Sequence, residues 1–489
     1  MPFLALPADI LIAILSIVDV STIIAVSRTC KRAHEAAITF AVWKAALEDL
    51  HARRFIDHLP VLHGKTTLEL VAIVKRLLRG PDAWSSSTPQ MRARPYLERT
   101  LPHTAPLRAI QLLEGGEYVM VFADNCLRCM RVAGGQPVLL LPIVSTALFQ
   151  AEIVDVPSAT ELRVFIWADS LIRVIAVELV DMGDCPPPRV DLSISMTGFS
   201  VLRSSKSTLA DNLVAAECER HSDRGDFFLL LDWEAGRYCA LGYPQASTCT
   251  LSLVPGFIVS TFAISKLPTS TMPSGPLRRP GEYIEVRSIA ALSKCWKPVK
   301  ENSIPHLYFK ITSLHAIPTV ASQSLGVPES STVEWSSHPL LDAQVFPSPI
   351  ARDTFRVWVS LYSPPLHEWD PPVRWSAQVS FRLELRAGST RLTQRSCAFD
   401  YNLKRRDQAI PYTMSYVGHM MVGGDALGSF LPTFAPASGH ARSPKNRGAL
   451  VHLDHLEGMS PVVHGMSVST WSGALTYVGE GKIVVAHYL

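Results

Sequence analysis

Residues 6–19 constrain this chain most, because they predict a short helix that is apolar on almost every side. Pro7 suits the first turn of a helix, where its missing N–H costs no hydrogen bond, and Asp9 is favourable near the positive end of the helix dipole. One face carries Ile10, Ile14 and Ile17, and a second face carries Leu11, Leu15 and Val18. A helix of this kind must be covered on two sides, and it is too short to cross a bilayer.

Two further short helices are predicted downstream. Either Asp19 or Ser21 can cap the second helix, in which one face is formed by Ile23, Val26 or Ser27, Cys30 and Ala37. The third helix covers residues 40–47 and presents Trp43. Helices this small cannot bury all of their apolar side chains among themselves. The sequence therefore predicts that a partner protein covers part of this module.

The N-terminal pattern resembles an F-box. The family has a Leu-Pro opening, paired apolar positions on its first helix, a Ser-x-x-Cys-like turn and a late Trp. The positions that carry the resemblance here are Leu6, Pro7, Ile10, Leu11, Ile14, Leu15, Ile23, Val26, Ser27, Cys30 and Trp43. Val20 stands where the family often has Pro, at a position that shapes a turn.

The resemblance implies that residues 1–50 bind the Skp-family adaptor of an SCF (Skp–cullin–F-box) ubiquitin ligase, and through it a cullin–RING complex. The same eleven residues are then the expected adaptor-binding residues. Buried Leu and Ile side chains at such an interface each contribute about 1.5 to 3 kcal/mol. The alternative is a helical cap that docks on its own chain.

Composition favours a protein receptor over a nucleic-acid binder. The formal net charge of +3 over 489 residues leaves no basic footprint for nucleic acid. Nine cysteines, an odd number without regular spacing, indicate reduced thiols. No apolar run reaches membrane-spanning length. We expect a soluble protein of the cytoplasm, the nucleus or both, with no membrane partner.

Residues 51–84 are predicted to form a helical linker, which Gly80 and Pro81 end. The triplet at residues 64–66 resembles the end of a phosphate loop, but no glycine and no strand precede it. We expect no nucleotide there. Trp84 is the expected anchor of the linker.

From residue 107 to residue 489 the pattern predicts strands and tight turns, after a Ser-, Pro- and Arg-rich boundary at residues 85–106. The clearest strands are residues 117–122, 127–132, 162–167, 172–179, 227–232, 237–241, 250–254, 257–264, 283–290, 307–311, 355–362, 379–385, 463–469, 474–478 and 482–488. The last of these is expected to complete the sheet that begins near Leu112. Polar or Pro-rich insertions are expected at residues 266–281, 322–349, 364–372 and 435–447, as decoration or as binding loops.

The predicted fold class is α+β multidomain: a three-helix F-box, the helical linker and a large all-β domain. A β-propeller of about seven or eight degenerate blades suits such a chain, because serial sheets around an axis leave few exposed edges. The turns at Asp232-Trp233 and at Trp471-x-Gly473 are similar to degenerate WD-type blade turns. A large β-sandwich or two smaller β-domains are the alternatives.

No catalytic motif is visible in the sequence, and no cofactor is expected. A zinc site would need Cys126, Cys129, Cys218 and His221 to converge, and alternation places the first two on opposite faces of a strand. The sequence therefore favours a non-enzymatic substrate receptor that binds an unknown protein through its β-domain. A β-propeller scaffold independent of any cullin ligase is the alternative, and a propeller hydrolase or lyase is disfavoured.

Overall fold

The computed structural model describes most of the chain between residues 6 and 488. The residues in this range that it leaves out are 58–61, 82–96, 103–106, 135–136, 144–146, 157–158, 169–170, 180–186, 197–198, 202–207, 221–225, 244–246, 265–280, 301, 305–310, 326–339, 363–375, 387, 401–414, 422–425, 430–448, 453–465, 472 and 480–481.

Four helices form the N-terminal module: α1 (Ala8–Leu15), α2 (Val20–Ser27), α3 (Lys31–Ala37) and α4 (Phe40–Ala52). The Asp19 carboxylate caps α2 by accepting a 2.7 Å hydrogen bond from the Thr22 N–H. The sequence predicted one second helix that continues through Cys30 to Ala37. This prediction is wrong, because α2 ends at Ser27 and a separate helix, α3, begins at Lys31. Cys30 has extended backbone there, and its sulfur caps α3 by accepting from the Ala33 N–H at 3.5 Å.

Helix α5 (Thr67–Arg79) follows, as the linker prediction required. Thr66 and Glu69 form a capping box at its start, in which the Thr66 N–H donates to the Glu69 carboxylate at 2.6 Å. Gly80 ends the helix with a φ of +78°, a conformation that favours glycine. The Thr66 hydroxyl thus has a structural task at the helix start. Trp84 lies outside the described residues.

The strands that the structure describes form seven sheets, which are numbered along the chain. The first contains β1 (Leu97–Pro102), β29 (Met466–Val468), β30 (Leu475–Gly479) and β31 (Lys482–His487). The second contains β2 (Leu107–Leu112), β3 (Tyr118–Ala123), β4 (Cys126–Arg131) and β5 (Pro137–Pro142). The third contains β6 (Ala147–Val156), β7 (Ala159–Ala168), β8 (Leu171–Leu179), β9 (Arg189–Met196) and β19 (Ser303–Ile304).

The fourth sheet contains β10 (Phe199–Val201), β11 (Thr208–Ala210), β12 (Leu213–Arg220), β13 (Asp226–Asp232), β14 (Arg237–Gly242), β18 (Lys297–Pro298) and β20 (Thr312–Ser313). The fifth contains β15 (Ser247–Val254), β16 (Phe257–Ile264), β17 (Gly281–Ser288) and β21 (Thr319–Ser324). The sixth contains β22 (Leu340–Pro347), β23 (Thr354–Tyr362), β24 (Ser376–Arg386) and β25 (Ser389–Asp400), and the seventh β26 (His419–Met421), β27 (Ala426–Ser429) and β28 (Ala449–His452). Short 3₁₀ turns, η4 (Ile289–Leu292) and η6 (Leu314–Ala316), lie between β17 and β21.

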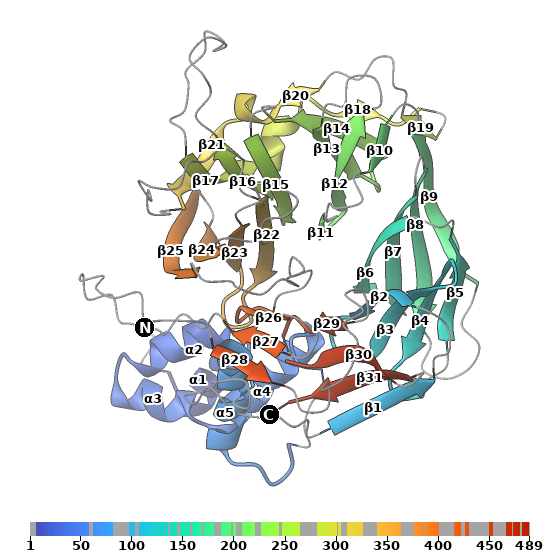
Figure 1. The fold of residues 1–489 in the computed structure, drawn as a ribbon. Coiled ribbons are helices and arrows are strands. Elements are labelled where there is room, and N and C mark those ends of the chain that lie inside the picture. Colours follow the sequence, from blue (N-terminus) through green and yellow to red (C-terminus); the bar gives the residue numbers. More distant parts are fainter. Residues whose placement is uncertain are drawn as a thin grey trace.

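Apolar clusters lie between successive sheets from the first to the sixth. Pairs that share a cluster are Leu101 with Val119 (first and second sheets), Phe122 with Leu162 (second and third), Phe165 with Phe227 (third and fourth), Leu230 with Phe262 (fourth and fifth) and Val259 with Val357 (fifth and sixth). Figure 1 shows the sheets following one another around a common centre, with the helices beside strands β26–β31. The N-terminal helices and a large all-β region of several sheets are therefore confirmed.

The last strand, β31, joins the two ends of the β region. It pairs antiparallel with β1, and Thr100 lies opposite Val484. The expectation that it would complete the sheet that begins near Leu112 is wrong, because β2 belongs to the second sheet. Strand β1 lies inside the Ser-, Pro- and Arg-rich stretch expected to be a boundary, where Leu101 is nevertheless buried.

Most hairpins predicted from the sequence are present where expected. One predicted insertion is instead partly a strand. Residues 340–347 were assigned to an insertion but form β22, in which Ala343 and Phe346 are buried. Strands β5, β6, β9 and β12 are among those that were not predicted. Of the other insertions, residues 266–280 of the stretch 266–281 and all of 364–372 and 435–447 lie outside the described residues, and Gly281 begins β17.

Candidate partner-binding site

Four of the eleven expected site residues form the interior of the helical module. Leu11, Leu15, Ile23 and Trp43 are buried in one apolar cluster. The Trp43 indole N–H donates to the Ala37 carbonyl at 2.9 Å, which ties α4 to the end of α3. These side chains shape the module and are not on its surface.

The exposed part of α1 is apolar as well. Ile10 is 43% exposed and Ile17, just beyond the helix end, is 76% exposed. Ile10 lies on the helix, and Ile17 lies in the turn that follows it. Ile38 and Phe40, at the turn from α3 to α4, are 49% and 39% exposed. Large exposed apolar side chains gathered in one small module indicate a protein-binding surface.

The remaining expected site residues lie between these extremes. Pro7 is exposed, whereas Leu6, Ile14, Val26, Ser27 and Cys30 are half-buried. The Leu6 carbonyl accepts a hydrogen bond from the Arg32 guanidinium at 2.5 Å, and the Ser27 hydroxyl donates to the Ile24 carbonyl at 2.8 Å. Both contacts hold local backbone in place.

The inner side of the helical module is covered by the chain's own β region. Its cluster includes Phe346 and Trp358 from the sixth sheet together with Tyr416, Val417 and Trp471. The inference that these helices need a partner to cover their apolar surface is therefore wrong for this side, because long-range packing within the chain supplies the cover. Among the described residues of the module, Ile10, Ile17, Ile38 and Phe40 stay exposed.

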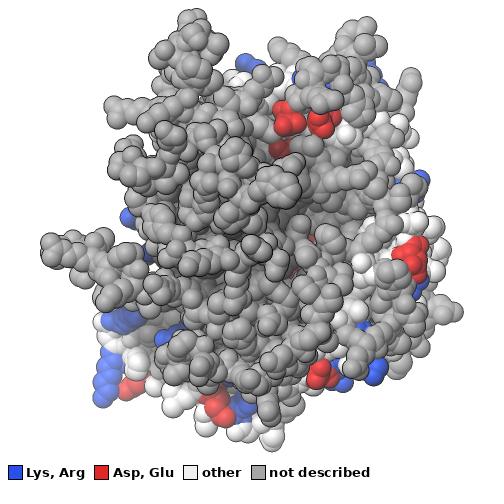
Figure 2. Space-filling view, viewed as in Figure 1, with Lys and Arg blue, Asp and Glu red and all other residues white. Residues whose placement is uncertain are grey.

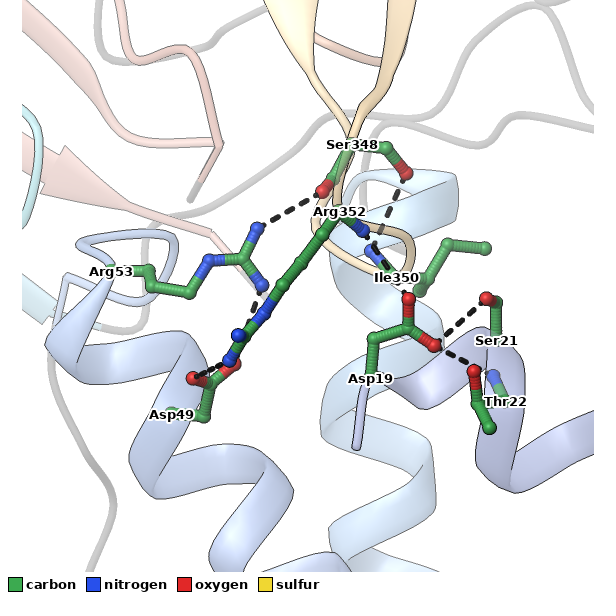
Figure 3. Close-up of polar contacts among 8 residues, drawn as sticks. All are labelled: Asp19, Ser21, Thr22, Asp49, Arg53, Ser348, Ile350 and Arg352. Atoms are coloured by element: carbon green, nitrogen blue, oxygen red, sulfur yellow. Dashed lines mark hydrogen bonds and ion pairs between the residues drawn. The ribbon is translucent and has the colours of Figure 1, made fainter. Parts of the chain in front are cut away.

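A loop of the sixth sheet, residues 348–353 between β22 and β23, fastens the helices from one side (Figure 3). The Ser21 N–H donates to the Ile350 carbonyl at 2.7 Å, and the Arg352 N–H donates to the Asp19 carboxylate at 3.4 Å. The Arg352 guanidinium pairs with Asp49 on α4 at 3.1 Å. We call residues 348–353 the Arg352 loop.

Asp19 has two tasks at this contact, capping α2 and accepting from the Arg352 loop. Partial burial by itself raises the pKa of the Asp19 carboxyl, but hydrogen bonds from Thr22, Ser21 and Arg352 outweigh burial and lower the pKa below its ordinary value. The carboxyl is therefore ionised at neutral pH, which strengthens each hydrogen bond it accepts.

The segment that follows α4, residues 53–57, reaches several sheets. Arg54 pairs with Asp155 of β6 at 2.8 Å, and Asp57 lies 3.9 Å from His487 of β31. Gly116, before β3, leaves room for Asp57, because a Cβ on this glycine would lie 2.5 Å from the Asp57 Cβ. The end of α4 is thus attached to the first, second and third sheets.

Trp471, which the sequence assigned to a WD-like turn, is the central contact of this junction. Its ring packs edge-on against Phe55 at 4.6 Å between centroids, and it also packs against Tyr416 at 4.9 Å and Phe346 at 6.2 Å. The indole N–H donates to the Glu114 carboxylate at 3.4 Å. Its distant partners could not be identified from the sequence, so this role was missed.

The other WD-like turn, at Asp232-Trp233, is held by hydrogen bonds to Asp232 from within its own sheet. The Asp232 carboxylate accepts from the Asn212 side chain at 2.8 Å, from the Ala235 N–H at 3.1 Å and from Arg237 at 2.9 Å. These contacts close the β13–β14 hairpin. Trp233, the next residue, stacks under the Arg163 guanidinium at 4.9 Å.

No group of three or more potential metal-ligating side chains occurs in the described part of the chain. Cys126 and Cys129 lie on β4 and Cys218 lies on β12, in another sheet, while His221 is outside the described residues. Within the same described part, no helix is both long enough and apolar enough to cross a membrane.

Residues 3–47 match the F-box-like family. This match confirms the resemblance seen in the sequence, and it covers α1 to α3 and part of α4. The chain is therefore an F-box-containing protein with a large β region behind the domain. Among curated proteins, none matches the chain.

Solved structures match the chain at low identity and low TM-score. The WD40 domain of SCAP from fission yeast is 9% identical, covers 66% of this chain and 79% of its own, and has a TM-score of 0.28. Extracellular domains 1-2 of Drosophila Semaphorin 1a are 7% identical, cover 81% of this chain and 88% of their own, and have a TM-score of 0.27.

Proposed function

We propose that this protein is a substrate receptor of an SCF-type ubiquitin ligase, built from an F-box and a β-propeller of seven degenerate blades. The F-box binds a Skp-family adaptor, and the propeller holds an unidentified target protein. The observation that carries the proposal is an F-box-like module with an apolar outer side, fixed to a large β region.

The exposed apolar residues of the module are the proposed adaptor contacts. Ile10 and Ile17 supply the centre of this face, flanked by Pro7 and the half-buried Ile14. Leu11, Leu15, Ile23 and Trp43 support it from beneath by holding the helices together. Of the eleven residues expected from the sequence, three are thus proposed contacts and four are supports.

Seven blades are proposed because the described strands form seven sheets, with apolar clusters shared between neighbours from the first to the sixth and with β1 and β31 joining the chain ends. This arrangement leaves few exposed sheet edges, as a ring of blades requires.

Attachment of the helices to the β region suits a receptor. The Arg352 loop, Trp471 and residues 53–57 hold the module at three places, so a bound target keeps a constant position relative to the adaptor. Ubiquitin transfer would then depend on proximity, with the chemistry performed by partner enzymes. The chain itself needs no catalytic group for this role.

The runner-up is a scaffold that never joins a cullin complex, and the buried inner side of the helices favours it. If the helices serve only to brace the β region, their outer side needs no adaptor. The two functions differ in one measurable property, which is adaptor binding.

The test is co-expression of the full chain with a Skp-family adaptor, followed by size-exclusion chromatography and calorimetric titration. Ile10→Glu with Ile17→Glu removes two exposed contacts, and Leu68→Glu on α5 is the matched control because Leu68 is 81% exposed. Loss of two apolar contacts costs about 2 to 3 kcal/mol, a weakening of roughly 30- to 150-fold.

A stoichiometric complex that the double variant loses and the control keeps supports the adaptor role. A wild-type chain that stays alone contradicts that role and favours the scaffold. Leu11→Glu is unsuitable for this purpose, since Leu11 is buried and a charge there would unfold the module itself.

A further inference from the structure

Two cysteines lie close together at the junction of the fourth and fifth sheets. Cys239 is buried on β14, and Cys295 is half-buried in the turn that follows η4. Cys239 belongs to the apolar cluster between these sheets and Cys295 packs against the same cluster, near enough to influence the Cys239 thiol. Both thiols are reduced in this structure.

The backbone holds this pair in place from both sides. Strand β18 pairs antiparallel with β14, with Tyr238 opposite Lys297, so the residues before Lys297 run alongside Cys239. The Cys295 N–H donates to the Leu292 carbonyl at 2.7 Å, which closes the turn. The Arg237 guanidinium lies 4.9 Å from the centre of the Trp296 ring and fixes the intervening residue.

Other cysteines direct their sulfur elsewhere. The thiols of Cys126, Cys218 and Cys249 donate to the backbone carbonyls of Leu127, Ala216 and Thr250. The Cys30 sulfur caps α3. Closeness to a second cysteine therefore distinguishes Cys239 and Cys295 from these four residues.

We propose that Cys239 and Cys295 form a redox-sensitive site that hydrogen peroxide converts to an intramolecular disulfide. The peroxide oxidises the Cys295 thiol to a sulfenic acid and leaves as one water. The Cys239 sulfur then bonds to the Cys295 sulfur, and its proton leaves with the sulfenic hydroxyl as a second water. The two thiols lose two electrons, and the peroxide O–O bond accepts them.

The order of these steps follows from the surroundings of the two thiols. Burial, together with nearby Cys295, raises the pKa of the Cys239 thiol to about 12, and the positive charge of Lys297 opposes this only in part. Cys239 is thus protonated and shielded, so the accessible Cys295 meets the oxidant first. Cys239 is the resolving thiol.

The disulfide would fasten one sheet to the next. Between Cys239 and Cys295 the chain builds β15, β16 and β17 of the fifth sheet, and it returns to pair β18 with β14 of the fourth. Oxidation therefore closes a covalent loop around this crossover. A closed loop reduces the conformational freedom of the unfolded chain and stabilises the folded one.

The test treats the full chain with hydrogen peroxide, blocks remaining thiols with an alkylating agent, and maps disulfide-linked peptides by mass spectrometry. We expect a Cys239–Cys295 cross-link that dithiothreitol reverses, with slower amide exchange in residues 289–298 and a higher melting temperature. In Cys239→Ser, dimedone should trap the Cys295 sulfenic acid. Cys126→Ser, which changes another half-buried thiol, should leave the cross-link unchanged.

Two results would overturn the proposal. One is that both thiols of the wild-type chain remain alkylatable after peroxide treatment that oxidises other cysteines. The other is that Cys295 proceeds to sulfinic acid at the same rate in the wild type and in Cys239→Ser, since a working resolving thiol must compete with that step. Thermal melts of the reduced variants verify that each serine substitution leaves the chain folded.

Discussion

Trp471→Ala is predicted to loosen the attachment of the helical module to the β region, because its buried ring is the central apolar contact between them. The indole packs against Phe55 after α4, against Phe346 of the sixth sheet and against Tyr416. Truncating a buried Trp to Ala costs about 3 to 5 kcal/mol, of which each aromatic pair accounts for about 0.5 to 1.5 kcal/mol. The Glu114 carboxylate also loses its 3.4 Å hydrogen bond.

Hydrogen exchange read by mass spectrometry measures this effect locally, and urea denaturation measures it globally. We expect faster exchange in α4 and in residues 53–57, whereas the third to fifth sheets, which Trp471 does not touch, keep their protection. The control is Trp296→Ala, a half-buried ring that packs against the cluster shared by the fourth and fifth sheets. It should leave exchange in the helices unchanged.

The reasoning is refuted if Trp471→Ala loses less than about 1 kcal/mol, a value typical of surface sites. It is also refuted if the fifth sheet loses protection together with α4, because Trp471 would then support the whole ring and not the junction.

Three further perturbations test other contacts of the same junction. Arg352→Ala should cost only about 0.2 to 1 kcal/mol in urea denaturation, since its ion pair with Asp49 is largely exposed, and a loss similar to that of Trp471→Ala would contradict this ranking. Gly116→Ala should lower the stability of the fold more than Gly236→Ala does. Both glycines have a positive φ, which costs alanine about 1 to 2 kcal/mol, but only at Gly116 would the new Cβ collide with Asp57. Equal melting temperatures of the two variants would disprove the contact. Burial raises the pKa of Glu152 to about 7, so the folded chain keeps a proton that the unfolded chain releases above about pH 4.5. The stability of the wild type should therefore decrease as the pH rises from about 4.5 to about 7. Glu152→Gln should remove this decrease, on the order of 1 to 3 kcal/mol, when denaturation curves at pH 5 and pH 8 are compared.

Local patterns predicted those parts of the fold that depend on neighbours in sequence. Asp19 caps α2, Gly80 ends α5, and tight turns separate most of the expected strands. Each of these depends on a side chain or a backbone angle within a few residues. The Leu-Pro opening and the late Trp43 identified the F-box-like module for the same reason.

Long-range contacts account for what the sequence did not predict. Strand β1 lies in a stretch rich in Pro and Arg, and it becomes a strand because β31 pairs with it. Periodicity assigned two apolar faces to α1, but it could not determine that the chain covers Leu11 and leaves Ile10 exposed. The partners of Trp471 are equally distant in sequence.

The junction couples the F-box-like module to closure of the β region. Residues 53–57 contact His487 on β31, and β31 holds β1, so the helices rest on the strands that join the two ends of the chain. Trp471 stands just before β30 in the same sheet. Anything that opens the first sheet therefore removes support from the helices, and anything that displaces the helices exposes Trp471 and Phe55. On this geometry, the stability of the proposed adaptor-binding face depends on the stability of the first sheet.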